Sequence, residues 1–395
     1  MGSKYPDVLI IGGGIGGTSL AYYCAKEGLS VSIVEKRYLA SGTSGANQGN
    51  ISIHTRTSGI FLDLNVECLP MFRTLKDELD FDIGFEEVSG FLVSEKLEHL
   101  KILDERVRQL NEKGLNAHFL SAEELLKREP HLSKNIKGGL FCQQSAWIYS
   151  PWLVVGFAQA AKRLGAKVYT RTKAHHIKCG EGKFQEVQTN EGVFRAGMVV
   201  IAAGTASKAL AKTAGIALPI ELFRGQLLVT EPTSEVGNHL IHELETADDK
   251  NSLNLDDPLY RHQIRLVFSR EKSGNCLIGR SSEPVGGDHC ETTSQVIKTL
   301  CRNACKFIPP LAHVSLIRTF AGIRAISSDD LPILGPIEGI QGLFLSVAHG
   351  DKGVNTSPII GKLLASYITT GKEPTLLKPF SAGRFARIRE GMNEK

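Results

Sequence analysis

The chain has 395 residues, 42% of them hydrophobic and 22% charged, which is typical of a globular protein long enough to form two domains. Lys and Arg exceed Asp and Glu by only four, so charge indicates neither nucleic acid nor an anionic membrane as a partner. The eight cysteines form no CxxC pair, no apolar run reaches the roughly 18 residues of a spanning helix, and the first residues lack a secretion signal, so we expect a cytoplasmic protein with no metal and no integral membrane segment.

The first predicted unit is a strand, a glycine-rich turn, a helix and a second strand. The apolar run DVLII precedes a GxGxxG motif formed by Gly12, Gly14 and Gly17, and the second strand, LSVSIVE, ends in Glu35. Gly12 permits the tight turn, Gly14 lets the backbone approach a pyrophosphate, and Gly17 allows close packing of helix on strand. The helix start offers unpaired N–H groups to phosphates, and Glu35 would accept hydrogen bonds from ribose hydroxyls. The unit predicts a dinucleotide site; the alternative is a glycine turn followed by an incidental acid.

This motif does not distinguish NAD from FAD, and three later segments favour FAD. The polar loop LASGTSGANQGNIS (39–52) suits a second phosphate and a ring system, and GMVVIAAGTAS (197–207) repeats the pattern of a strand entering a glycine turn. Residues 342–368 predict a strand, a glycine-rich turn and a helix from about Ser357 with Pro358 at its first position.

The order of these signals predicts a discontinuous FAD-binding domain with an inserted substrate-binding domain. We assign residues 1–86, 148–220 and 318–395 to the former and 87–147 and 221–317 to the latter, where strand-like stretches suggest a mixed sheet.

Several local signals lie in and beside the two insertions. The first insertion carries a predicted helix, KLEHLKILDERVRQLNEKG, and a capping box from Ser121 to Glu124, and just beyond it Ser150 is the expected N-cap of a helix. The second insertion predicts strands at QLLVT, IRLVFS and CLIG and a helix over 294–307. The polar stretch 233–262 predicts either a mobile lid or a solvated loop.

Six motifs follow one another in the chain: GxGxxG with Glu35, SGxNxG, IAAG, FRGQLLV (223–229), GIRAISSDDLPILG (322–335) and HGDKGV (349–354). These motifs and their order resemble those of the D-amino-acid oxidase superfamily of FAD-dependent amine oxidoreductases. The chain is most similar to its glycine oxidases, sarcosine oxidase beta subunits and the flavin subunits of hydrogen cyanide synthase and opine oxidase. The resemblance implies an α/β fold, a Rossmann-like FAD-binding domain and an inserted mixed-sheet α+β substrate domain. It also implies non-covalent FAD, since no cysteine stands near Arg324.

The resemblance assigns Arg324 as the clamp for a substrate carboxylate, with a structural pair to Asp329 or Asp330 as the alternative. Ala325 stands where the family usually has proline. We predict that the turn HGDKGV and Lys352 stabilise negative charge on a reduced flavin, the alternative being a surface lysine at a helix start. Three lesser candidates are Arg224, Tyr260 and His262.

The predicted catalytic residues are Arg324, Lys352 and His54, although a lone histidine such as His54 is more often a packed residue. The predicted cofactor-binding residues are Gly12, Gly14, Ile15, Gly17, Glu35, Lys36, Ser44, Asn47, Gln48, Gly49, Ala174, Ala203, Gly204, Arg324, Gly350, Asp351, Lys352, Gly353 and Val354.

The predicted reaction is FAD-dependent oxidation of the C–N bond of a small amino or imino acid of the glycine, sarcosine, D-amino acid, proline or opine type. A hydride would leave the alpha carbon for the flavin, with no dedicated base, and the imine would hydrolyse. The alternatives are a 2-hydroxy-acid dehydrogenase and a flavin-bearing scaffold or electron-transfer subunit. The sequence leaves open oxygen, a quinone or a partner protein as the electron acceptor, and a homo- or hetero-oligomer as the assembly.

Overall fold

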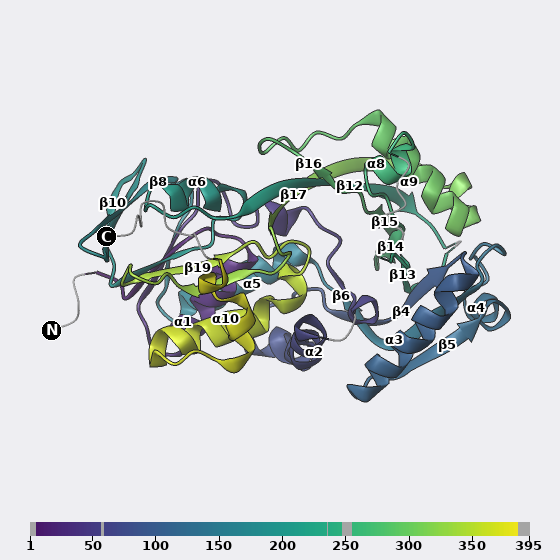
Figure 1. Cartoon of the computed structure of the whole chain (residues 1–395), viewed down its shortest axis with the longest axis horizontal. Helices are drawn as coiled ribbons and strands as arrows, with labels where there is room; N and C mark the ends of the chain where they lie inside the picture. The colour runs from purple at the N-terminus through teal and green to yellow at the C-terminus, as the bar shows by residue number, and fades with distance from the viewer. Residues whose placement is uncertain (1–4, 57–58, 235, 247–254, 386–395) are drawn as a thin grey trace.

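The computed structural model describes residues 5–56, 59–234, 236–246 and 255–385, and it contains a six-stranded, a three-stranded and a large ten-stranded β-sheet arrangement (Figure 1). The six-stranded sheet, in spatial order, consists of β18 (Ile333–Pro336), β19 (Leu343–Val347), β11 (Met198–Ile201), β1 (Val8–Ile11), β2 (Val31–Val34) and β7 (Lys167–Tyr169). It is parallel except for β18, and its short strands are apolar and mostly buried, as expected of a sheet covered on both faces. The three-stranded sheet consists of β10 (Gly192–Phe194), β9 (Lys183–Thr189) and β8 (Ala174–Gly180).

The large sheet is predominantly antiparallel. Its strands, in spatial order, are β16 (Glu283–Pro284), β12 (Ile220–Pro232), β15 (Asn275–Gly279), β14 (Val267–Arg270), β13 (Leu240–Glu243), β4 (Glu86–Ser94), β6 (Gly138–Trp147) and β3 (Asn50–Ile51), with β17 (Leu316–Ser327) paired to β12 and β5 (Ala117–Ser121) paired to β6. The long pair β12 and β17 runs from the region of the six-stranded sheet toward the end of the molecule that carries α9 (Figure 1).

Helices cover these sheets (Figure 1). They are α1 (Ile15–Lys26), α2 (Ile60–Glu78), α3 (Leu100–Glu112), α4 (Ala122–Arg128), α5 (Ser150–Arg163), α6 (Ser207–Lys212), α8 (Pro258–Arg261), α9 (Ser294–Phe307) and α10 (Gly353–Thr370). Among the described residues, no helix combines the length and apolarity needed to cross a membrane.

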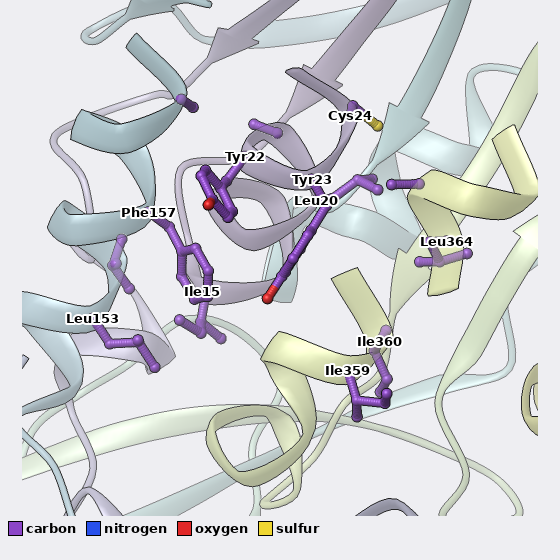
Figure 2. Close-up of a cluster of buried hydrophobic side chains, with 14 of the residues drawn as sticks. Ile15, Leu20, Tyr22, Tyr23, Cys24, Leu153, Phe157, Ile359, Ile360 and Leu364 are labelled. Atoms are coloured by element: carbon purple, nitrogen blue, oxygen red, sulfur yellow. The ribbon is translucent and has the colours of Figure 1, made fainter. Parts of the chain in front are cut away.

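Helix α1 is the centre of the core beside the six-stranded sheet. Figure 2 shows Tyr22 and Tyr23 of α1 next to Phe157 of α5, with ring centroids 5.7 and 6.1 Å from Phe157, and the apolar side chains of α10 on the other side. A Cβ on Gly361 of α10 would overlap the Ser19 side chain, so only glycine allows α1 and α10 to approach this closely. The core therefore fixes α1, whose first turn opens toward the cavity described below.

The structure confirms the predicted fold class, the strands at 226–230 and 276–279, the helix over 294–307 and the Ser121 capping box, in which Ser121 Oγ accepts from Glu124 N. The domain boundaries stay a prediction; β17 and β3, which we assigned to FAD-domain segments, are hydrogen-bonded into the large sheet. Part of the predicted lid or loop, residues 235 and 247–254, lies outside the described residues.

Two predicted helix starts were wrong by a few residues. The N-cap of α5 is Tyr149, because the Ser150 hydroxyl donates to Asn47 Oδ1 (2.6 Å) instead of capping the helix. Helix α10 begins at Gly353, not at Ser357, and contains Pro358 in its interior. The proline leaves the Val354 carbonyl without its helical N–H, and Ser357 Oγ donates to that carbonyl at 3.2 Å, which compensates for the loss.

Candidate active site

A cavity of about 1150 Å³ extends from the β1–α1 turn to the large sheet. It exceeds the ~300 to 1,000 Å³ of most small-molecule pockets, so it can hold a dinucleotide and a small substrate together. Its lining includes these predicted residues: Gly12, Gly14, Ile15, Glu35, Lys36, Ser44, Asn47, Gln48, Gly49, Ala203, Gly204, Arg324, Gly350, Asp351, Lys352, Gly353 and Val354. Gly17, Ala174 and His54 do not line it.

The glycines at the end of β1 shape one end of the cavity. Gly12 has φ +124°, and a Cβ there would overlap the Ala202 carbonyl at the end of β11. A Cβ on Gly17 would overlap the Gly12 carbonyl, so Gly17 packs helix against strand and is withdrawn from the cavity. Gly14 is the N-cap of α1 and has no side chain of its own to cap the helix, although Ser44 Oγ accepts a hydrogen bond from Ile15 N at 3.0 Å. The positive end of the helix faces the cavity.

Glu35 lies beside this helix start. It is buried, and its two carboxylate oxygens accept hydrogen bonds from the backbone N–H groups of Gly13 and Arg37, each at 2.8 Å. Ser41 Oγ also donates to Oε1 at 3.3 Å, so the carboxylate is held in one orientation, with a lone pair of Oε2 left for a ribose hydroxyl. Ala174 instead starts β8, pairs with Thr189 and packs in the core behind the sheet, because the three-stranded sheet turns away from the cavity.

The polar loop 39–52 forms the next wall and is braced by its own side chains. The Asn47 amide donates to two carbonyls within the loop (3.1 and 2.9 Å) and accepts from Gly49 N at 2.8 Å. Gln48 donates to carbonyls of β14 and β15 at 3.0 and 3.1 Å, and this ties the loop to the large sheet. The two side chains therefore act mainly by shaping the loop.

The turn before α10 closes the cavity from the other side. Lys352 is buried, and its Nζ lies 2.6 Å from Asp330 Oδ2 and 3.0 Å from Asp351 Oδ1. Its charge is thus shared between two carboxylates. An adjacent backbone bridge joins Ile326 of β17 to His349, which brings the end of β17 against this turn.

Arg324 of β17 is half-buried in the cavity wall. Its Nη2 donates to the Ser281 carbonyl at 2.9 Å, whereas its Nε is buried with no partner among the described residues. The predicted alternative, a pair with Asp329 or Asp330, is absent from the described residues: Asp329 pairs with Arg384 at 2.7 Å and Asp330 with Lys352. Arg324 therefore has a donor left for an anionic ligand.

His54 is fully buried behind the wall. Its Nδ1 lies 2.8 Å from Ser145 Oγ and its Nε2 lies 2.9 Å from Nδ1 of His242, which does line the cavity. Burial, with a smaller effect of the Arg56 charge, lowers the pKa of His54 to about 3. Burial also lowers the pKa of His242, so both rings are neutral at physiological pH.

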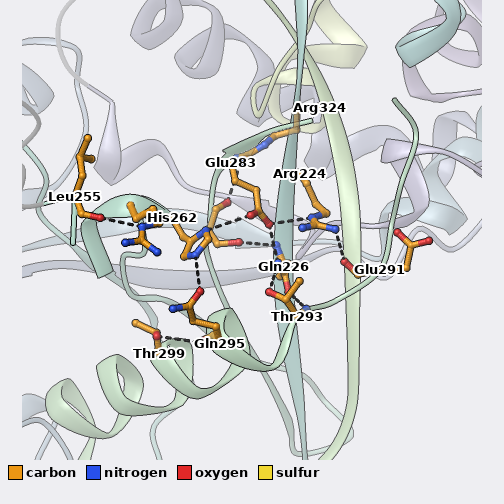
Figure 3. A network of polar contacts seen from close by, with 12 residues as sticks. Arg224, Gln226, Leu255, His262, Glu283, Glu291, Thr293, Gln295, Thr299 and Arg324 are labelled. Atoms are coloured by element: carbon orange, nitrogen blue, oxygen red, sulfur yellow. Dashed lines mark hydrogen bonds and ion pairs between the residues drawn. The ribbon is translucent and has the colours of Figure 1, made fainter. Parts of the chain in front are cut away.

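Two of the lesser candidates, Arg224 and His262, belong to a polar network beside the cavity. Figure 3 shows Glu283 between them; its Oε1 lies 2.9 Å from Arg224 Nε and its Oε2 lies 3.1 Å from His262 Nδ1. Gln226, which lines the cavity, donates to the same carboxylate at 2.7 Å. Arg224, Tyr260 and His262 do not line the cavity, and the contacts of Arg224 and His262 connect β12 to the segment before α9 and to α9 itself.

Sequence reasoning missed a group of charged and polar residues that line the cavity: Arg56, Arg106, His242, Glu243, Glu245, Arg265 and Arg280. None stands in a motif with fixed spacing, and apart from His242, Glu243 and Glu245, which lie on or just after β13, they come from different segments of the chain.

The glycine cradle, the helix start that faces the cavity and the oriented Glu35 fit the predicted FAD. Comparison with known proteins gives the same cofactor: the family model described as FAD dependent oxidoreductase matches residues 7–367. The chain is 26% identical to hydrogen cyanide synthase subunit HcnC of Pseudomonas protegens, covering 97% of both chains, and 27% identical to glycine oxidase of Geobacillus kaustophilus, covering 96% of this chain and 97% of that one. It is 26% identical to sarcosine oxidase subunit beta of an Arthrobacter species, covering 97% and 91%. The crystal structure of glycine oxidase from Geobacillus kaustophilus has the same fold, with a TM-score of 0.86 at 24% identity over 97% of this chain and 100% of that chain.

Proposed function

The chain belongs to the FAD dependent oxidoreductase family and is an FAD-dependent enzyme, and on this premise we propose that it oxidises the C–N bond of a small amino or imino acid. Relatives named for glycine, sarcosine and opine oxidation support an amine substrate. FAD, when bound, supplies the acceptor for the hydride that leaves the alpha carbon.

The observation that carries the proposal is the unpaired donor of Arg324 in the cavity that also holds the glycine cradle. The charge of Arg324 is only half-exposed, and within the described residues it has a single hydrogen-bond acceptor, the Ser281 carbonyl. Burying a guanidinium N–H without an acceptor is unfavourable, and a substrate carboxylate would accept two parallel N–H bonds of the guanidinium fork. The bound carboxylate would then fix the alpha carbon relative to the flavin ring, and this positioning would accelerate the hydride transfer.

The proposed residue roles follow the geometry of the wall. Gly12 and Gly14 would hold the pyrophosphate at the start of α1, Glu35 the adenosine ribose, and the backbone from Gly350 to Val354 the pyrimidine side of the flavin, all non-covalently. The amine would enter neutral, lose a hydride from its alpha carbon and pass its N–H proton to water. Water would then add to the resulting imine, and cleavage of its C–N bond would give an oxo acid and release the nitrogen as ammonia or an amine.

The electron acceptor and the assembly are also proposals. Several relatives are named as subunits, which favours a partner protein as acceptor over a chain that works alone. A cytoplasmic location stays a prediction from the sequence.

Two measurements on the FAD-loaded protein test this function. The first is the visible spectrum without oxygen before and after glycine, sarcosine, D-alanine, D- or L-proline, an opine or a 2-hydroxy acid; bleaching by an amine supports the proposal, and bleaching by the hydroxy acid alone contradicts it. The second compares Arg324→Ala with the control Arg224→Ala. We expect Arg324→Ala to raise the Michaelis constant for a carboxylate-bearing amine by about tenfold or more and to leave that for a neutral amine unchanged. An equal rise for both amines would overturn the assigned role.

A further inference from the structure

The cavity contains more unpaired positive charge than one carboxylate requires. Among the described residues, Arg56 makes no side-chain hydrogen bond or ion pair, and its Nε is buried. Arg324 of β17 lines the same cavity, and its buried Nε also has no partner among the described residues. A buried guanidinium N–H without an acceptor is costly, so an anionic group of a ligand would be stabilised beside each of these arginines.

Arg56 and Arg324 come from different walls. Arg56 follows β3 and the 3₁₀ turn Ile53–Thr55, beside β6, whereas Arg324 projects from β17 beside the Ser281 carbonyl. Arg280 lies in the same region and is paired with Glu245 at 2.7 Å. The two unpaired guanidinium groups therefore approach one space from two directions.

Arg56, Arg280 and Arg324 line one cavity together with Asp351 and His242, and the electrostatics of the last two groups agree with this placement. Burial raises the pKa of Asp351, but Lys352, Arg56, Arg280 and Arg324 outweigh it and hold this pKa well below its usual range. At His242, Arg280 and Arg56 add to the lowering of the pKa by burial. The Asp351 carboxylate is already paired with Lys352, so it does not neutralise the charges of Arg56, Arg280 and Arg324.

We propose that the substrate carries a second acidic group, bound by Arg56 with Arg280 beside it, while Arg324 binds the carboxylate next to the amine. The substrate class is then a dicarboxylic amine, such as an N-(carboxyalkyl) amino acid or an acidic amino acid. This inference rests on the proposed function. It narrows the substrate class from any small amino or imino acid to one with two acidic groups.

The test uses non-oxidisable ligands, so it does not depend on turnover. Binding of glutarate and of pentanoate, which have the same chain length and differ by one carboxylate, is measured by calorimetry on the FAD-loaded protein. We expect glutarate to bind the unsubstituted protein about tenfold or more tightly than pentanoate. Arg56→Gln should remove this preference and leave the affinity for pentanoate within about twofold, whereas Arg324→Gln should weaken both ligands.

Arg106→Gln is the matched control. Arg106 lines the same cavity, and its buried Nε also has no partner among the described residues, but it comes from α3, which contributes none of Arg56, Arg280 and Arg324. Arg106→Gln should keep the preference for glutarate, and Arg56→Lys, which keeps the charge, should retain part of it. Retained pentanoate binding shows that the Arg56 variant is folded.

Equal affinities of the unsubstituted protein for glutarate and pentanoate would overturn the inference, and so would an unchanged preference for glutarate in Arg56→Gln. Loss of that preference in Arg106→Gln instead would also overturn it. Release of FAD from Arg56→Gln would overturn it by assigning Arg56 to the cofactor. Failure of the proposed function has a different signature, since no amine would then bleach the flavin whatever the glutarate preference.

Discussion

The imidazole of His54 meets that of His242 at 2.9 Å, and only His242 reaches the cavity. Because the folded pKa of His54 is about 3 and that of an unfolded histidine is about 6.5, the unfolded chain binds more protons between these pH values. We expect the free energy of unfolding to fall as the pH drops from about 6.5 toward 3, with a contribution from this residue approaching about 1.4 kcal/mol per pH unit.

The measurement is urea unfolding of the protein and of His54→Gln at pH 7, 6 and 5. His54→Gln should be less stable at pH 7, because Ser145 and His242 lose a partner, but its stability should depend less steeply on pH. The exposed His118→Gln is the control and should keep the original pH dependence. Parallel pH profiles for the two variants would contradict the burial argument.

The second prediction concerns the close contact of Gly12 with the Ala202 carbonyl. Gly12→Ala introduces both a positive-φ alanine and an overlap with backbone that cannot rotate away, so we expect a loss of about 2 to 5 kcal/mol of stability together with weaker FAD binding. Gly28→Ala is the matched control, because it also has positive φ but meets no atom within 4 Å, and it should cost only about 1 kcal/mol. Thermal unfolding and flavin absorbance after gel filtration measure the two effects; equal losses in the two variants would show that the overlap is relieved.

The third prediction concerns Glu35, whose carboxylate is held by the N–H groups of Gly13 and Arg37. If it accepts hydrogen bonds from the ribose, Glu35→Ala should weaken FAD binding by about tenfold to a hundredfold, measured by titrating the apoprotein with FAD. Riboflavin, which has no adenosine, should bind the variant and the unsubstituted protein equally. An equal loss for both ligands would indicate that Glu35 acts only by holding the loop. The exposed Glu27→Ala serves as the control substitution.

The local elements were predictable because each depends on neighbours in the chain. The strand, glycine turn and helix that end at Lys26 form from a contiguous apolar pattern, and the Ser121 capping box forms from residues three positions apart. Prediction was less accurate where a distant partner competes for a local group. Ser150 fails to cap α5 because its hydroxyl bonds Asn47, which lies 103 residues away in the chain.

The sequence by itself determined the family, the dinucleotide cradle and the place of Arg324 in its motif, since these rest on residue types at short, fixed spacings. Only the tertiary structure decided what surrounds Arg324. His54 and His242 are 188 residues apart in the chain, so no spacing in the sequence predicts their contact. Arg56, Arg280 and Arg324 likewise come from three distant segments, so no spacing predicts that they line one cavity. The pairing of β12 with β17 and of β3 with β6 brings these charges to one cavity, because hydrogen-bonded strands join segments that are far apart in the chain.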